Sequence, residues 1–199
     1  MHISEGILSI PILAGGAAIT VAALAYSLKR LDSNLLPQTA IMAAGFFVAT
    51  LIHVPIPPAQ AHLLLVGLMG LVLGWAAFPA IFVALLLQAL LFQYGGFTTL
   101  GINTFNLAFP AVLCGLLLRP LLRKGHALCA AILAGLGGVL LSGLLVAFSL
   151  FLSGDNFFNL ALLLFAAHIP IIVLEALITP LVVCFLIKVR PQVFRFAVH

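Results

Sequence analysis

The sequence predicts an all-α, polytopic membrane protein whose residues 1–199 form one domain. Hydrophobic residues make up 65% of the 199 residues and charged residues only 6%, whereas soluble domains carry about 25% charged residues. Apolar runs long enough to cross a bilayer recur along the chain. The net charge of +4 comes from basic residues that flank these runs, so it indicates membrane topology and not a nucleic-acid partner.

The first predicted membrane helix covers residues 7–28, and the charges beside it indicate its orientation. Glu5 is the only charged side chain before it, and Lys29 and Arg30 follow it. A cleaved signal peptide carries positive charge ahead of its apolar core. We therefore expect an uncleaved helix with its N-terminus outside and the basic pair in the cytoplasm.

Three alanines, Ala14, Ala18 and Ala22, recur at every fourth position of this helix and therefore share one face. Small residues at this spacing let membrane helices approach closely. This alanine stripe either packs against another helix of the same chain or docks on a partner membrane subunit.

A second helix is predicted over residues 37–53. Pro55, Pro57 and Pro58 follow it and exclude regular helix from the next segment. We place this proline-rich loop outside, on the same side as the N-terminus.

The apolar stretch 62–94 is too long for one straight span. Gly74 and Pro79 mark a break inside it, so we expect two short helices, over residues 62–73 and 79–94. Two passes also bring the next basic cluster to the cytoplasmic side, in agreement with the positive-inside rule.

The remaining helices are predicted over residues 105–122, 127–152 and 157–187, after an outer loop at 95–104 that is rich in glycine and threonine. The result is about seven helices with a cytoplasmic C-terminus. All eight Lys and Arg residues then lie on the cytoplasmic side.

The first two residues can chelate a metal ion. The α-amine of Met1 and the amide and imidazole nitrogens of His2 can reach one ion through small fused rings. Ni(II) and Cu(II) favour planar nitrogen sites, and Co(II) also accepts imidazole. The amine and imidazole must lose their protons to bind, so we expect metal affinity to fall at low pH.

His62 lies on the same predicted face as this terminus and can supply a fourth nitrogen. It is either this ligand or a polar residue at the membrane interface. Other residues near this face also have two interpretations. His53 is either a polar helix end or a further ligand. Asn103 either forms a hydrogen bond that orients a ligand or caps its loop. Glu5 either adds charge near the metal or begins a helix.

Two ionisable residues, His168 and Glu175, lie inside the predicted last helix, two turns apart and on one face. Such residues usually face the interior of a bundle. They form either a second metal site or a structural polar contact. No Ser/His/Asp set, HExxH or CxxC motif is present in the sequence, which predicts no catalytic site. The three cysteines (Cys114, Cys129 and Cys184) lie within apolar runs and are interpreted as packing residues.

The sequence resembles the CbiM/NikM family of substrate-binding membrane subunits in energy-coupling-factor (ECF) transporters for cobalt and nickel. The resemblance covers nearly the whole chain. Its matching segments are residues 1–6 (Met-His-Ile-Ser-Glu-Gly), 55–57, 88–92, 95–96, 100–106 and 189–191, together with His62, His168 and Glu175. His53 departs from the pattern, because a neutral polar residue is expected there.

This resemblance implies a seven-helix fold and a metal site formed by Met1, His2 and His62. It implies a prokaryotic plasma-membrane module with a transmembrane coupling subunit, two ATPase subunits and, in some systems, a small accessory membrane protein. The chain would then be a transporter subunit and not an enzyme. The metal would be its substrate, with no prosthetic group.

Two functions therefore remain open. The first is capture of Co(II) or Ni(II) for an ATP-driven importer. The sequence carries no GxxxxGK[ST] motif, so the energy would come from another chain. The second is a stand-alone proton-linked permease or membrane metalloenzyme that uses His168 and Glu175. The donor atoms alone do not separate nickel from cobalt.

Overall fold

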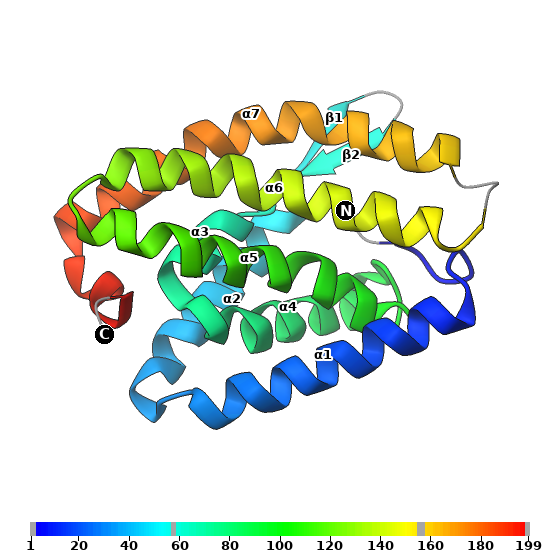
Figure 1. Cartoon of the computed structure of the whole chain (residues 1–199), viewed down its shortest axis with the longest axis horizontal. Coiled ribbons are helices and arrows are strands. Elements are labelled where there is room, and N and C mark those ends of the chain that lie inside the picture. The colour runs from blue at the N-terminus through cyan, green and yellow to red at the C-terminus, as the bar shows by residue number, and fades with distance from the viewer. Residues whose placement is uncertain (1–2, 57–58, 155–157, 198–199) are drawn as a thin grey trace.

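A computed structural model describes residues 3–56, 59–154 and 158–197. These residues form seven α-helices and one two-stranded hairpin (Figure 1). The elements are α1 (Ile10–Arg30), α2 (Leu36–Leu51), β1 (His53–Ile56), β2 (Ala59–His62), α3 (Val66–Leu73), α4 (Ala77–Phe92), α5 (Leu100–Arg123), α6 (Ala127–Phe151) and α7 (Phe158–Val189), with short 3₁₀ helices η1 (Ser33–Leu35), η2 (Gly74–Ala76) and η4 (Pro191–Ala197). The predicted all-α class is confirmed.

The described residues contain six helical stretches that are long and apolar enough to cross a membrane. Five of these correspond to α1, η1 with α2, α5, α6 and the greater part of α7, and the sixth, Val66–Phe92, contains both α3 and α4. The protein is therefore a multi-pass membrane protein. The orientation of its termini stays a prediction.

The predicted break between α3 and α4 is present. Gly74 takes a φ of 57°, a left-handed value that glycine adopts without steric cost. Gly70 of α3 faces Ala111 in the middle of α5, and Gly74 faces Arg119 closer to the C-terminal end of α5. The chain then turns back, and α4 returns toward the N-terminal end of α5 (Figure 1).

Helix α3 lies at the centre of the bundle, with all eight of its residues buried. It fits there because glycines remove side chains where backbones meet. A Cβ atom on Gly67 would clash with the carbonyl of Ala134 in α6, and one on Gly70 would clash with the carbonyl of Ala111 in α5. Close packing on two sides thus fixes the helix that follows His62.

The alanine stripe of α1 faces away from the bundle. Ala14, Ala18 and Ala22 are all exposed. The buried side of α1 instead carries Gly16, which packs against Ile102 of α5, and Thr20, whose hydroxyl donates to the Gly101 carbonyl at 2.7 Å. Of the two interpretations of the stripe, packing inside this chain is therefore wrong, and docking on a partner subunit stays a prediction.

Three predicted boundaries also need correction. The second and third helices were expected to end at His53 and to begin at His62, but both residues belong to the antiparallel hairpin, where they pair with each other. A two-stranded hairpin tolerates Pro55, which has no N–H to donate. The fifth helix begins at Leu100 and not at residue 105, because the polar side chains there find partners inside the protein.

Candidate metal centre

The segment from Ile3 to Ser9 is packed against the bundle. Ile3 is only 4% exposed, and Leu8 is also buried. Both belong to an apolar cluster with three residues of α5 and α6 (Ile102, Val146 and Leu150). Hydrophobic burial therefore holds the start of the described chain against these two helices.

Asn103 of α5 binds the backbone of Ile3 with both polar atoms of its side chain. The Ile3 N–H donates to Asn103 Oδ1 at 3.0 Å, and Asn103 Nδ2 donates to the Ile3 carbonyl at 3.0 Å. Nδ2 also donates to Thr99 Oγ1 at 3.2 Å, which orients the amide. Asn103 is 3% exposed, so these bonds lie away from solvent. We call this pair of bonds the Asn103–Ile3 clamp.

Met1 and His2, two of the predicted ligands, lie outside the described residues. The covalent link to Ile3 connects them to the Asn103–Ile3 clamp. The clamp thus acts at the first described position after the predicted chelate. That Asn103 orients a metal ligand stays a prediction.

Glu5 forms a second hydrogen-bonded contact between the N-terminal segment and the bundle. Its Oε1 accepts from the Thr98 N–H at 3.1 Å and from Thr98 Oγ1 at 3.2 Å. The Ser9 N–H donates to Ser153 Oγ at 3.3 Å, after α6. The alternative that Glu5 begins a helix is wrong, because α1 starts at Ile10 and has no acidic residue in its first turn.

His62 ends β2 and is 5% exposed. Its backbone is paired with that of His53 on β1, whose side chain is not among those the structure describes. His62 Nδ1 lies 3.2 Å from the Leu63 carbonyl oxygen. A carbonyl only accepts, so this contact places the proton on Nδ1 and the lone pair of a neutral ring on Nε2. Burial lowers the pKa of His62, which favours the neutral form that a metal requires.

Of the two ionisable residues of α7, Glu175 contacts the segment that follows His62. Glu175 Oε1 accepts from the N–H groups of Leu64 at 2.7 Å and Leu65 at 2.6 Å. His168 Nδ1 donates to the Leu164 carbonyl at 2.7 Å, one turn earlier in α7.

These contacts favour a structural role for Glu175 over a second metal site. Its carboxylate is fully buried and accepts hydrogen bonds from two backbone amides and a hydroxyl. The described residues contain no group of three or more His, Cys, Asp or Glu side chains that could hold a metal ion. The sequence did not reveal the link between Glu175 and the His62 segment, because a backbone amide carries no sequence signal.

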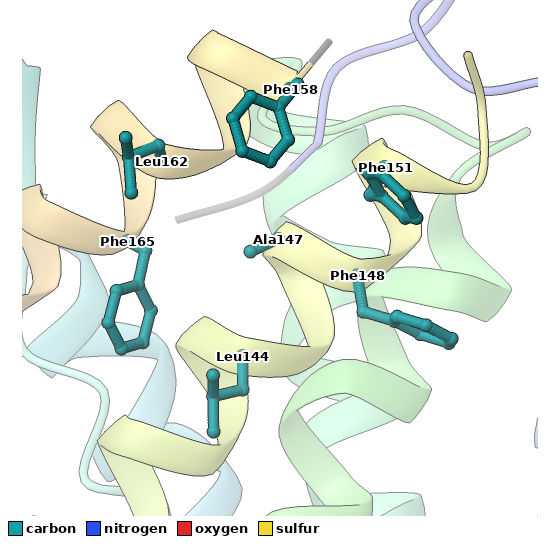
Figure 2. Close-up of a pocket in the computed structure, with 7 residues that line it drawn as sticks. All are labelled: Leu144, Ala147, Phe148, Phe151, Phe158, Leu162 and Phe165. Carbon is teal, nitrogen blue, oxygen red and sulfur yellow. The ribbon is translucent and has the colours of Figure 1, made fainter. Parts of the chain in front are cut away.

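An apolar groove lies between α6 and α7 (Figure 2). Its volume is about 290 Å³, and all of its lining side chains are hydrocarbon. They are Leu144, Ala147, Phe148, Phe151, Phe158, Leu162 and Phe165. A groove without nitrogen, oxygen or sulfur ligands does not suit a metal ion.

Comparison with known proteins gives a consistent match along the chain. Residues 2–193 match the model of the CbiM family, described as the cobalt uptake substrate-specific transmembrane region. A putative metal transport protein of Haemophilus influenzae is 46% identical over 98% of this chain and 97% of its own length. A putative fused nickel transport protein NikMN of Archaeoglobus fulgidus is 31% identical over 98% of this chain and 68% of its own length.

A solved structure shares the fold. The crystal structure of a transition metal transporter superposes with a TM-score of 0.83 at 32% sequence identity, and the match covers 99% of this chain and 98% of that one. A truncated form of a transition metal transporter also gives a TM-score of 0.83, over 94% of this chain.

Proposed function

The chain belongs to the CbiM family of cobalt uptake substrate-specific transmembrane regions, and on that premise we propose that it captures Ni(II) or Co(II) for an ATP-driven ECF importer. It acts as the substrate-specific subunit in the plasma membrane of a prokaryote, with its N-terminus outside and its C-terminus in the cytoplasm. The observation that carries this proposal is the Asn103–Ile3 clamp, which holds Ile3, the first described residue, against α5.

The proposed ligands are four nitrogens: the Met1 amine, the His2 amide and imidazole, and the His62 imidazole. The Leu63 carbonyl supports this set, because its contact with Nδ1 fixes the tautomer of a neutral ring in which Nε2 is the nitrogen that carries the lone pair. Four nitrogens in a plane suit Ni(II) and are compatible with Co(II). The metal is the transported substrate and not a prosthetic group.

The proposed partners are a transmembrane coupling subunit, two ATPase subunits and, in some assemblies, a small accessory membrane protein. The exposed alanine stripe of α1 supports docking on a membrane partner, since its small side chains face away from this chain's own core. The ATPases supply the energy, and this subunit catalyses no reaction.

The proposed ligand set can be tested because it includes the α-amine of Met1, which an added residue would convert into an amide. We would measure Ni(II) and Co(II) binding by calorimetry for the native chain, for a chain with one residue added before Met1, and for His62→Ala. Both changes remove a nitrogen donor, so affinity should fall at least about 100-fold. The matched control is His126→Ala, which alters an exposed histidine at the start of α6. Unchanged affinity in the extended chain would reject the proposed site.

Reconstitution separates this function from the alternative. With the coupling and ATPase subunits in liposomes, metal uptake should require ATP. Uptake by this chain alone, driven by a proton gradient, would instead support the stand-alone permease.

A further inference from the structure

We propose that Glu175 is a positioning residue for the metal ligand His62 and that it acts through a single peptide unit. This inference rests on the proposed function. Glu175 Oε1 accepts from the Leu64 N–H at 2.7 Å. The other end of the same peptide unit is the Leu63 carbonyl, which contacts His62 Nδ1 at 3.2 Å. The order is therefore carboxylate, amide N–H, carbonyl, imidazole.

Such a series of bonds strengthens each of its members. A carboxylate that accepts from an amide N–H polarises the peptide unit and makes its carbonyl a better acceptor. The Leu63 carbonyl then holds the Nδ1 proton of His62 more firmly. Metal-binding histidines commonly donate this second ring N–H to a carboxylate or a carbonyl, which sets the tautomer and the ring orientation. Here the peptide unit between Leu63 and Leu64 links His62 to both kinds of acceptor, because its carbonyl contacts the imidazole and its N–H donates to the Glu175 carboxylate.

The geometry of the turn supports a dedicated role for the carboxylate. Leu65, which precedes α3, takes a left-handed conformation with a φ of 48°. Residues with a side chain rarely adopt this conformation. It lets the N–H groups of Leu64 and Leu65 converge on the same oxygen of Glu175. Successive amides of this kind form an anion-binding concavity, and the N-terminus of α3 adds positive potential.

Contacts with Thr179 and Gly135 also restrict the movement of Glu175. Glu175 is fully buried, and Thr179 Oγ1 donates to its Oε2 at 3.3 Å. The Glu175 carbonyl packs so closely on Gly135 of α6 that a Cβ atom there would clash with it. A buried carboxylate on a tightly packed helix can fix the orientation of His62, which lies in a connecting segment.

The experiment compares Ni(II) affinity and the visible absorption band of bound Ni(II) in purified full-length protein with its native N-terminus. Glu175→Leu removes the acceptor, so affinity should fall about 10- to 100-fold. The absorption band of Ni(II) bound to Glu175→Leu should move toward that of the His62→Ala protein, because the His62 imidazole is no longer oriented to bind the metal. Glu175→Gln keeps a neutral oxygen acceptor and should recover part of the affinity and the native band. Thr179→Val removes only the contact to Oε2 and should keep the native band.

The results distinguish a failure of the role proposed for Glu175 from a failure of the proposed ligand set. A Glu175→Leu protein with native affinity, or with lower affinity and an unshifted band, would overturn the inference, because His62 would still be bound as before. If Glu175→Leu does not fold, Glu175→Asp replaces it, since its carboxylate is one methylene further from the amides. If His62→Ala itself binds Ni(II) normally, the proposed ligand set fails. Normal binding by Glu175→Leu beside a defective His62→Ala rejects only the role of Glu175.

Discussion

Asn103 and Ile3, which are 100 positions apart in the chain, are joined by two reciprocal hydrogen bonds of 3.0 Å each. Both residues are buried. The bonds satisfy an N–H and a carbonyl that would otherwise lie unpaired at the start of the described chain. An α5 side chain thus controls the backbone position next to the predicted chelate.

Replacing Asn103 should therefore weaken metal binding. In Asn103→Leu the Ile3 N–H and carbonyl lose their partners, and each unsatisfied buried group costs about 1–3 kcal/mol. Calorimetry should show Ni(II) affinity reduced at least about tenfold, and Asn103→Asp, which keeps only the acceptor, should be intermediate. The control is Asn106→Ala, one turn further along α5, whose side chain bonds Ser149 of α6. Equal losses in Asn103→Leu and Asn106→Ala would indicate general destabilisation.

Glu5→Gln should have a smaller effect. Its contacts with Thr98 are exposed, and solvent-exposed charged contacts contribute little, on the order of 1 kcal/mol or less. We expect Ni(II) affinity to fall by about fivefold or less. Asp32→Asn controls for the loss of charge, because Asp32 lies after the opposite end of α1. A loss larger than that of Asn103→Leu would mean that Glu5 acts on the metal itself.

Gly67→Ala should destabilise the bundle. The added methyl group would clash with the Ala134 carbonyl where α3 crosses α6, and overpacking of this kind costs about 1–3 kcal/mol. Thermal unfolding in detergent should show a lower midpoint. Gly45→Ala is the matched control, because nothing lies within 4 Å of its Cβ position on α2. A Gly67→Ala protein as stable as Gly45→Ala would contradict the packing described for α3.

Ala18→Leu should separate assembly from metal binding. Ala18 is exposed on the alanine stripe, so a larger side chain leaves the core of this chain unchanged. We expect native Ni(II) affinity but reduced co-purification with co-expressed coupling and ATPase subunits. Val21→Leu, at a position of α1 that is 65% exposed, controls for added bulk. Normal assembly of Ala18→Leu would show that the partner docks elsewhere.

Much of the fold could be predicted because membrane helices depend on local hydrophobicity. The predicted helix over residues 127–152 differs by one residue from α6, Ala127–Phe151, and the break at Gly74 is present. The hairpin could not be predicted in the same way. Its strands are only four residues each and are stabilised by pairing with each other, which no periodicity in either strand reveals.

The sequence does not reveal the start of α5 for a similar reason. Residues 100–104 include glycine, asparagine and threonine, which are typical of a loop. In the folded protein Gly101 packs on Ala17 of α1, and Asn103 bonds Ile3. Tertiary contacts therefore make these residues suitable for a helix end.

The sequence by itself determined that this chain is a multi-pass membrane protein, and it singled out Asn103, His62 and Glu175 as polar residues that require an explanation. Composition and hydrophobic runs suffice for this, because a bilayer demands long apolar helices whatever their neighbours are. Only the tertiary structure decided which partner each polar residue has. Asn103 holds Ile3, and Glu175 holds the amides next to His62. Their partners are backbone groups, which every residue except proline carries alike, so only the packing of the helices selects among them.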